Sequence, residues 1–195
     1  MKTRIEQESS FWNSFAKRYD RFIRHTLGNT YQILFEKLRI DTFESDRILE
    51  IATGTGLLSF EICRQVRHID AIDISPEMIR IAKQKQKEKE ILNVSFEVGD
   101  SSDIHFSDNS FDIVLASNVL HLLFNPEEAL SEIHRVLKPD GRAILPTFCH
   151  GENIKSRLIS GFMSLFGFKA RNKWSVKSFE TFVLNNGFKP INVKS

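Results

Sequence analysis

The sequence lacks the features that mark secreted and membrane-spanning proteins. Its 195 residues include only two cysteines, Cys63 and Cys149, which lie far apart and provide no disulfide framework, so a reducing compartment is expected. No apolar run approaches the roughly 18 residues that span a bilayer, and the polar N-terminus does not resemble a signal peptide. These absences predict a cytoplasmic protein without integral membrane contact.

An excess of charge is also missing. The sequence has 27 basic and 25 acidic residues, for a net charge of +2. Nucleic-acid-binding domains usually carry a strongly basic patch or a pI above about 9, so nucleic acid is not the expected partner, although the pI of 8.5 leaves that class open. Because no repeat, low-complexity segment or Pro- or Ser-rich linker interrupts the chain, we expect a single domain over residues 1–195.

Short apolar runs alternate with helical segments at intervals of about 20–25 residues, which is typical of βαβ units. We therefore expect an α/β fold: a doubly wound, mostly parallel sheet with helices on both faces and extra N-terminal helices. Strands are predicted over 47–51, 69–74, 94–98, 111–116, 143–148 and 188–193. Helices are predicted over 9–38 (broken into two near Gly28 and Asn29), after 56, from Ser75-Pro76 onward, and over 126–137, 154–168 and 175–185.

A glycine-rich turn follows the first predicted strand. Ligands of open α/β sheets bind at the carboxyl ends of the strands, and Gly54 and Gly56 let the backbone turn tightly and approach a ligand closely. The dinucleotide fingerprint G-x-G-x-x-G would place its third glycine where this chain has Ser59. A nicotinamide-dependent oxidoreductase is therefore disfavoured.

Two acidic residues follow the next two strands. Asp73 is positioned to accept hydrogen bonds from both hydroxyls of a ribose, with a helix-capping role before Ser75 as the alternative. Asp100, after Gly99, can accept from an adenine amino group, with a simple turn residue as the alternative. Together with the glycine turn, these carboxylates indicate a cofactor that contains a nucleoside.

The stretch from 109 to 141 carries the most distinctive motifs: Ser110-Phe111-Asp112, Asn118-Val119-Leu120-His121, and Glu132 to Pro139 followed by Asp140-Gly141. With these in register, the chain resembles the class I S-adenosylmethionine-dependent methyltransferases, in particular the small-molecule branch that includes the ubiquinone/menaquinone-biosynthesis enzymes. The resemblance extends from about Phe11 to the C-terminus. It implies a Rossmann-like fold, S-adenosylmethionine as cofactor, and in-line methyl transfer to a small acceptor with release of S-adenosylhomocysteine.

The resemblance also implies roles by position. Residues after the first strand border the amino-acid half of the cofactor, those after the second hold the ribose and adenine, those after the third meet the adenine edge, and those after the fourth lie under the methionine. Tyr19 belongs to an N-terminal helical lid, residues 1–40, although a core aromatic is the alternative. The implied cofactor-binding residues are Tyr19, Glu50, Ala52, Gly54, Gly56, Asp73, Ile74, Met78, Asp100, Ser101, Ser117 and Asn118.

Two positions depart from the family pattern. Ala52 replaces the first glycine of the usual triplet; it is small enough for close approach but tolerates a positive φ poorly. The family's sheet usually ends with a seventh, antiparallel strand, whereas this sequence stops soon after the strand predicted at 188–193. Either that last strand lies outside the sequence or the sheet ends short.

The acceptor is less well determined. His121, just past the fourth strand, is the candidate general base if the nucleophile must lose a proton, and a structural or substrate-shaping histidine is the alternative. No cluster of metal ligands is visible. Enzymes that methylate amino groups of nucleobases or Gln often have Asn/Asp-Pro-Pro-aromatic where this chain has Ser117 to Leu120, which argues against those substrates.

The segment 150–174 combines an apolar run, which includes Phe162 and Phe166, with a basic rim from Lys155 to Lys173. We expect it to cap a small apolar or aromatic acceptor, or to touch a membrane surface that carries a lipid-like acceptor. An ordinary core helix is the structural alternative. A nucleic-acid or protein methyltransferase, and a non-catalytic protein that binds S-adenosylmethionine, are the alternative functions.

Overall fold

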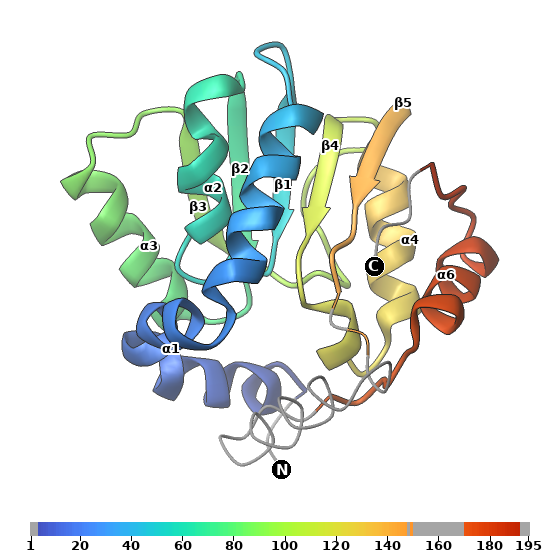
Figure 1. Ribbon diagram of the computed structural model, residues 1–195, viewed down its shortest axis with the longest axis horizontal. Coiled ribbons are helices and arrows are strands. Elements are labelled where there is room, and N and C mark those ends of the chain that lie inside the picture. The colour runs from blue at the N-terminus through green and yellow to red at the C-terminus, as the bar shows by residue number, and fades with distance from the viewer. Residues whose placement is uncertain (1–3, 148, 150–169, 192–195) are drawn as a thin grey trace.

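The computed structural model describes residues 4–147, 149 and 170–191. They form a five-stranded parallel sheet of order β3-β2-β1-β4-β5 (Figure 1). The strands are β1 (Arg47–Ile51), β2 (His68–Asp73), β3 (Val94–Val98), β4 (Phe111–Ala116) and β5 (Leu137–Ile144). The helices are α1 (Arg4–Asp41), α2 (Leu57–Ile62), α3 (Pro76–Glu88), α4 (Pro126–Val136) and α6 (Val176–Asn185), with short 3-10 turns η1 (Cys63–Gln65) and η2 (Leu120–Leu122).

Helices cover both faces of the sheet because its central strands are apolar on both sides. In β1, Ile48 packs in one cluster with Leu58 of α2, and its neighbour Leu49 packs in a second cluster with Ile133 of α4. Successive side chains of a strand point to opposite faces, so one near-continuous apolar run supplies both clusters. The predicted α/β fold with a parallel sheet and helices on both faces is confirmed.

The strand order creates a switch point, and we use the word crevice for the region at the carboxyl ends of β1, β2 and β4 beside it. β1 pairs with β2 on one side and with β4 on the other, so the chain reverses its direction of winding between β1 and β4. In open α/β sheets, ligands bind outside the carboxyl ends of the strands at such a switch point. The residues that follow β1, β2 and β4 therefore frame the candidate site.

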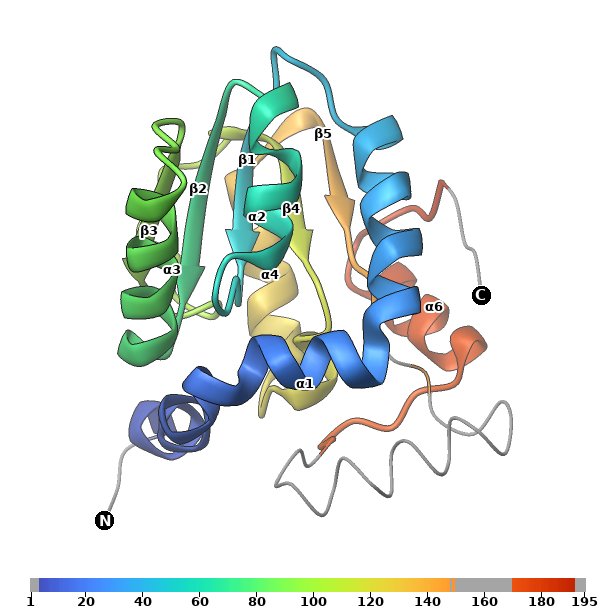
Figure 2. The ribbon, with the colours of Figure 1, turned by 60° about the vertical axis from the view of Figure 1, so that its left-hand side comes forward.

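Helix α1 is one continuous element, and the predicted division into two helices at Gly28 and Asn29 is wrong. Figure 2 shows its ribbon bend, so that the first part runs beneath the carboxyl ends of the strands and the second part rises beside the sheet. Glycine lowers helix stability by about 1 kcal/mol but does not end a helix that packing holds on both sides. Buried Tyr31 and Leu38 provide that packing after the glycine.

Strand β5 begins at Leu137, six residues before the strand predicted from 143. The predicted helix over 126–137 and strand from 143 left 138–141, which contain Pro139, outside any strand, and this prediction was wrong. The pairing of β4 with β5 shifts register between Phe111 and Ile113, and this irregularity accommodates the proline, which lacks a backbone N–H. The predicted end of this strand, Phe148, lies outside the described residues.

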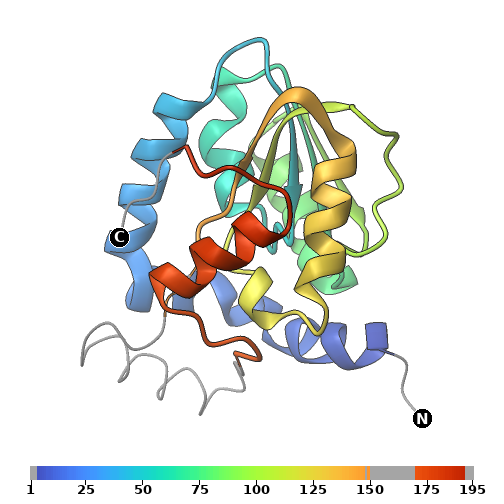
Figure 3. The ribbon, with the colours of Figure 1, turned by 90° about the vertical axis from the view of Figure 1, so that its right-hand side faces the viewer.

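The residues after α6 also differ from the prediction. Residues 188–191 form no strand, so the strand predicted over 188–193 is wrong in its described part. Phe188 instead packs edge-on against the His134 ring of α4, with ring centroids 5.7 Å apart, which places this segment against a helix. Helix α6 lies in front of the β5 edge (Figure 3), and the helix predicted over 154–168 lies outside the described residues.

Within the described residues, all strand pairs of the sheet are parallel. Over the same part of the chain, no helix has the length and apolar character needed to cross a bilayer.

Candidate functional site

The turn after β1 has an unusual backbone. Ala52, Gly54 and Gly56 have φ values of 53°, 58° and 80°, so every second residue is left-handed. A Cβ at Gly56 would lie 2.8 Å from the Phe96 ring, which restricts this position to glycine. Ala52 adopts the left-handed conformation despite its Cβ, at a cost of about 1 kcal/mol. The alternation gives a tight loop directly after the carboxyl end of β1.

Asp73 links this turn to the end of β2. Its Oδ2 accepts a hydrogen bond from the Gly54 N–H at 2.8 Å, and its Oδ1 accepts one from the Ser75 N–H at 2.9 Å. Burial raises the pKa of Asp73 to about 6, against the opposing effect of these two bonds. Each carboxylate oxygen has a second lone pair, so Asp73 can also accept from a ligand hydroxyl. Helix α3 is capped by Ser75, whose Oγ accepts from the Met78 N–H at 3.1 Å.

Glu50 lies at the end of β1 and is 2% exposed. Its Oε2 accepts a hydrogen bond from the Ser59 hydroxyl, and burial raises its pKa to about 7. Nearby, the buried Thr53 hydroxyl has no partner within strict hydrogen-bond distance among the described residues, although it lies close enough to Glu50 to lower the pKa of that carboxyl against the larger effect of burial. Buried polar groups normally have a well-formed hydrogen bond, so an incompletely bonded hydroxyl beside the buried Glu50 carboxylate fits a site that receives a polar ligand.

The first part of α1 covers the turn. A Cβ built on Gly54 would lie 3.4 Å from Cε1 of Tyr19, so the tyrosine ring lies directly over this glycine. Asn13 Oδ1 accepts from the Ser75 hydroxyl at 2.7 Å, on the α3 side of the crevice. Burial, followed by the charge and hydrogen bonding of the Tyr31 hydroxyl, raises the pKa of Tyr19 well above its usual value. The N-terminal helix thus contacts the residues that follow both β1 and β2.

Tyr31 was not predicted from the sequence. It is buried in the second part of α1, and side-chain hydrogen bonds with Tyr19 and Asn118 lower its pKa against the larger, raising effect of burial. It therefore connects the covering helix with the loop after β4. The available signal was compositional: the chain has 17 phenylalanines but only two tyrosines, and both hydroxyls meet here.

The predicted adenine side is formed by residues after β2 and β3. Ile74 is half-buried, and Met78 is buried on the inner face of α3. Asp100 Oδ1 accepts from both the backbone N–H and the hydroxyl of Ser102, each at 2.9 Å, so part of this carboxylate shapes its own turn. Ser101 is buried beside it.

The loop after β4 closes the other side of the crevice. Asn118 is left-handed, with a φ of 53°; its N–H donates to the Pro146 carbonyl at 2.7 Å, and its Nδ2 donates to Ser117 Oγ at 3.3 Å. His121 is buried in η2, with Nδ1 3.2 Å from Thr147 Oγ1. The structure thus places His121 at the β4 and β5 ends of the crevice.

Of the predicted capping segment 150–174, the structure describes 170–174. The backbone N–H groups of Arg171 and Asn172 donate to the His121 carbonyl at 2.9 and 3.1 Å. The guanidinium of Arg171 lies 3.3 Å from the centroid of the Phe124 ring. The described end of the segment is therefore attached to the loop that carries His121, whereas Phe162 and Phe166 lie outside the described residues.

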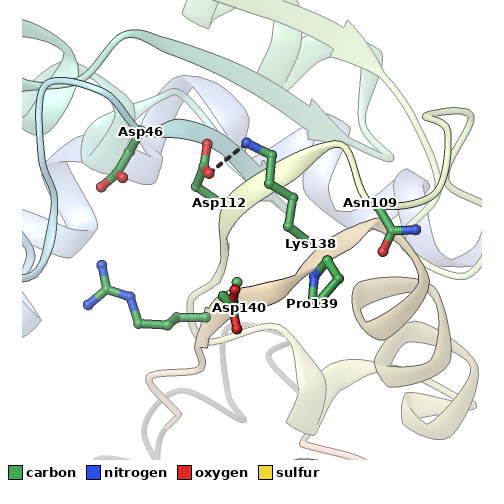
Figure 4. Close-up of a pocket in the computed structure, with 8 residues that line it drawn as sticks. Asp46, Asn109, Asp112, Lys138, Pro139 and Asp140 are labelled. Atoms are coloured by element: carbon green, nitrogen blue, oxygen red, sulfur yellow. Dashed lines mark hydrogen bonds and ion pairs between the residues drawn. The ribbon is translucent and has the colours of Figure 1, made fainter.

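A separate hollow of about 470 Å³ lies at the opposite, amino-terminal ends of the strands (Figure 4). Lys138 Nζ donates to Asp112 Oδ1 at 2.6 Å across it. The charges of Lys138 and Asp112 are paired with one another. Because ligands of open sheets bind at the other end of the strands, this hollow is not the candidate site. Its lining residues are Asp46, Asn109, Asp112, Lys138, Pro139, Asp140, Gly141 and Arg142.

Comparison with known proteins agrees with this geometry. A family described as a methyltransferase domain matches residues 43–178. The demethylmenaquinone methyltransferase of Porphyromonas gingivalis is 34% identical over 138 residues, covering 68% of this chain and 56% of that protein. The ubiquinone/menaquinone biosynthesis C-methyltransferase of Geotalea uraniireducens is 31% identical over 150 residues, covering 73% of this chain and 63% of that protein.

A solved structure, that of a putative S-adenosyl-L-methionine-dependent methyltransferase from Methanococcus maripaludis, superimposes with a TM-score of 0.71 at 25% identity, covering 92% of this chain and 86% of that one. The chain spans 56% and 63% of the length of the two curated relatives. These matches support S-adenosylmethionine as the cofactor, and they confirm the resemblance drawn from the motifs. The chain belongs to the family of methyltransferase domains.

Proposed function

We propose that the protein transfers the methyl group of S-adenosylmethionine to a small apolar or aromatic acceptor and releases S-adenosylhomocysteine. The observation that carries the proposal is the arrangement of Asp73, which bridges the Gly54 turn and the start of α3 at the switch point of the sheet. A buried carboxylate between a glycine turn and the end of β2 suits a nucleoside ribose.

The other residues of the crevice suit the remaining parts of this cofactor. Glu50, the Thr53 hydroxyl and the turn through Ala52 and Gly56 would face its amino-acid half. The adenine would lie among residues after β2 and β3, the methionine would lie against the loop after β4, and Tyr19 would cover the cofactor. The proposed adenine contacts are Ile74, Met78, Asp100 and Ser101, and the proposed methionine contacts are Ser117 and Asn118.

When bound, the sulfonium supplies a methyl group already activated for transfer. The chain's own task is to hold the acceptor in line with that methyl group and to exclude water, and such positioning accounts for much of the rate in reactions of this kind. His121, buried at the β4 end of the crevice, would take the proton of an acceptor that must lose one. For other acceptors it would shape the pocket.

The apolar or aromatic class of acceptor has two supports. The curated relatives are named for demethylmenaquinone and for ubiquinone/menaquinone biosynthesis. The segment 150–174 is rich in phenylalanine, and its described end is bonded to the loop of His121. We regard residues 1–195 as one methyltransferase domain, with residues 1–40 as a lid and residues 150–174 as the acceptor cap. We place it in the cytoplasm, with peripheral membrane contact only where the acceptor is lipid-like.

Turnover with candidate acceptors tests this function. The purified protein would be incubated with S-adenosylmethionine and quinol-type or other aromatic acceptors, and S-adenosylhomocysteine would be measured. Acceptor-dependent production is expected. Tight cofactor binding with no turnover on any acceptor class would instead indicate a non-catalytic cofactor-binding protein, and turnover only on nucleic acid or protein would reassign the substrate.

A further inference from the structure

Asp20 connects the covering helix with two parts of the cofactor site. It follows Tyr19 in α1, and its Oδ1 accepts a hydrogen bond from the Thr55 hydroxyl of the glycine turn. Its Oδ2 forms an ion pair with Lys85 Nζ, from the last turn of α3. The same ammonium donates to the Thr55 carbonyl at 3.3 Å. One carboxylate and one ammonium therefore join α1, the turn and α3.

These groups are better shielded from water than an ordinary surface ion pair. The Lys85 and Asp20 side chains are 20% and 31% exposed, and Thr55 is fully buried. Exposed pairs contribute little because water and salt screen them, whereas partial burial and a second, directional hydrogen bond strengthen the contact. The contact is therefore less weakened by water and salt than an exposed ion pair.

The contacts match residue for residue. Tyr19 lies over Gly54, and Asp20 bonds to Thr55, so two consecutive residues of α1 meet two consecutive residues of the turn. The Tyr19 ring touches Gly54 by van der Waals contact, which sets no direction. The bonds of Asp20 to the turn do set a direction, and with the bonds of Asn13 to the start of α3 they fix which residues of α1 face the turn.

With α1 in this position, the residues proposed to hold the cofactor are closed off. Glu50, Thr53 and Asp73 are all buried, although the proposed function requires them to meet a ligand. Tyr19 of α1 lies near both Glu50 and Asp73, so the proposed function requires the first part of α1 to move away for the cofactor to enter and to return for it to be retained. A contact that fixes α1 on the turn therefore affects both steps.

We propose that Asp20 is a positioning residue: with Lys85 and Thr55 it fastens the first part of α1 to the glycine turn and so sets Tyr19 over the bound cofactor. The proposal rests on the proposed function, since it assigns Asp20 to the retention of S-adenosylmethionine and its product. Asp20 itself need not touch the cofactor, because its bonds are to the turn and to α3.

The test compares Asp20→Asn with a control variant that breaks a different ion pair of α1. Glu61→Gln breaks the ion pair of Arg39 with Glu61, which joins α1 to α2 away from the turn. All variants carry Trp174→Phe, so that Trp12, whose ring centroid is 6.4 Å from that of Tyr19, is the single tryptophan. Acrylamide quenching of Trp12 and hydrogen exchange of residues 13–22 are measured without cofactor. Stopped-flow fluorescence then gives the rates of S-adenosylhomocysteine binding and release.

Asp20→Asn should expose Trp12 to the quencher, speed exchange in residues 13–22, and weaken S-adenosylhomocysteine binding about tenfold, mainly through faster release. Lys85→Met should do the same, and the exchanged pair Asp20→Lys with Lys85→Asp should recover most of the loss. The affinity of Glu61→Gln for S-adenosylhomocysteine, and the rate at which it releases this product, should stay within about twofold of the parent values.

Unchanged quenching, exchange and release in Asp20→Asn would overturn the proposal. So would equal effects of Glu61→Gln, because they would show that any loosening of α1 has the same result. Failure of the parent protein to bind S-adenosylhomocysteine or S-adenosylmethionine would instead count against the proposed function. In that case, quenching and exchange measured without cofactor would still decide whether Asp20 fastens α1.

Discussion

Replacing Glu50 with glutamine should stabilise the cofactor-free protein above neutral pH and weaken cofactor binding. Burial raises the pKa of Glu50 from 4.5 to about 7, so the folded protein holds a proton that the unfolded chain has lost across that interval. A raised carboxyl pKa favours folding fully below about 4.5, and this advantage is lost as the pH rises through about 7. Glutamine stays neutral at every pH and removes this dependence.

The magnitude follows from the two pKa values. The interval from 4.5 to about 7, at about 1.4 kcal/mol for each pKa unit, corresponds to on the order of 3 kcal/mol of unfolding free energy. The raised pKa of Asp73, about 6, gives a change of the same sign in both proteins, and the loss of the Glu50 charge removes a repulsion between the two carboxylates in the variant. Glutamine also keeps an oxygen that can accept from Ser59.

The assay is urea unfolding of the parent and Glu50→Gln without cofactor, at about pH 5 and about pH 8.5. The stability difference between the two proteins should shift in favour of the variant by about 2–3 kcal/mol between these pH values. Glu61→Gln, which removes a carboxylate paired with Arg39, serves as the control and should run parallel to the parent. If the free energy of unfolding of Glu50→Gln also changed with pH in parallel with that of the parent, burial would not raise the pKa of Glu50 as described.

Three further changes test other parts of the site. Ala52→Gly removes the Cβ that strains the left-handed backbone at this position. In chemical denaturation, the free energy of unfolding should stay unchanged or rise by up to about 1 kcal/mol, and a clear loss would show that Ala52 is not strained. Asp73→Ala should weaken S-adenosylhomocysteine binding by about 1–3 kcal/mol in calorimetry, and unchanged affinity would remove its ribose role. His121→Ala should lower turnover about 10²–10⁴-fold at saturating acceptor if His121 is a general base, whereas a loss below about threefold would leave it a packing role.

Much of the fold could be predicted because local sequence and tertiary structure agree. The apolar runs of β1 and β4 have the predicted bounds, and Ser75 with Pro76 begins α3 as the capping pattern indicates. The errors arose where packing overrides local signals. Gly28 lies within a helix that its flanks hold in place, and Pro139 lies in a strand whose register shifts around it.

The residues of the candidate site also fall into two groups: those that the local sequence predicts and those that only the tertiary structure reveals. Asp73 and the turn through Gly54 could be located from the sequence because each follows a predicted strand, and parallel strands end at one edge. Asp20, Tyr31 and Lys85 could not, because their partners lie far away in the chain and come near only when α1 crosses the strand ends. No local pattern records such a contact.

The central claim is that this crevice binds S-adenosylmethionine. Calorimetric titration of the purified protein with S-adenosylmethionine, S-adenosylhomocysteine and NAD tests it most directly. The account predicts micromolar binding of the two sulfur compounds and no binding of NAD. Absence of binding for both sulfur compounds, or binding of NAD in their place, would contradict it.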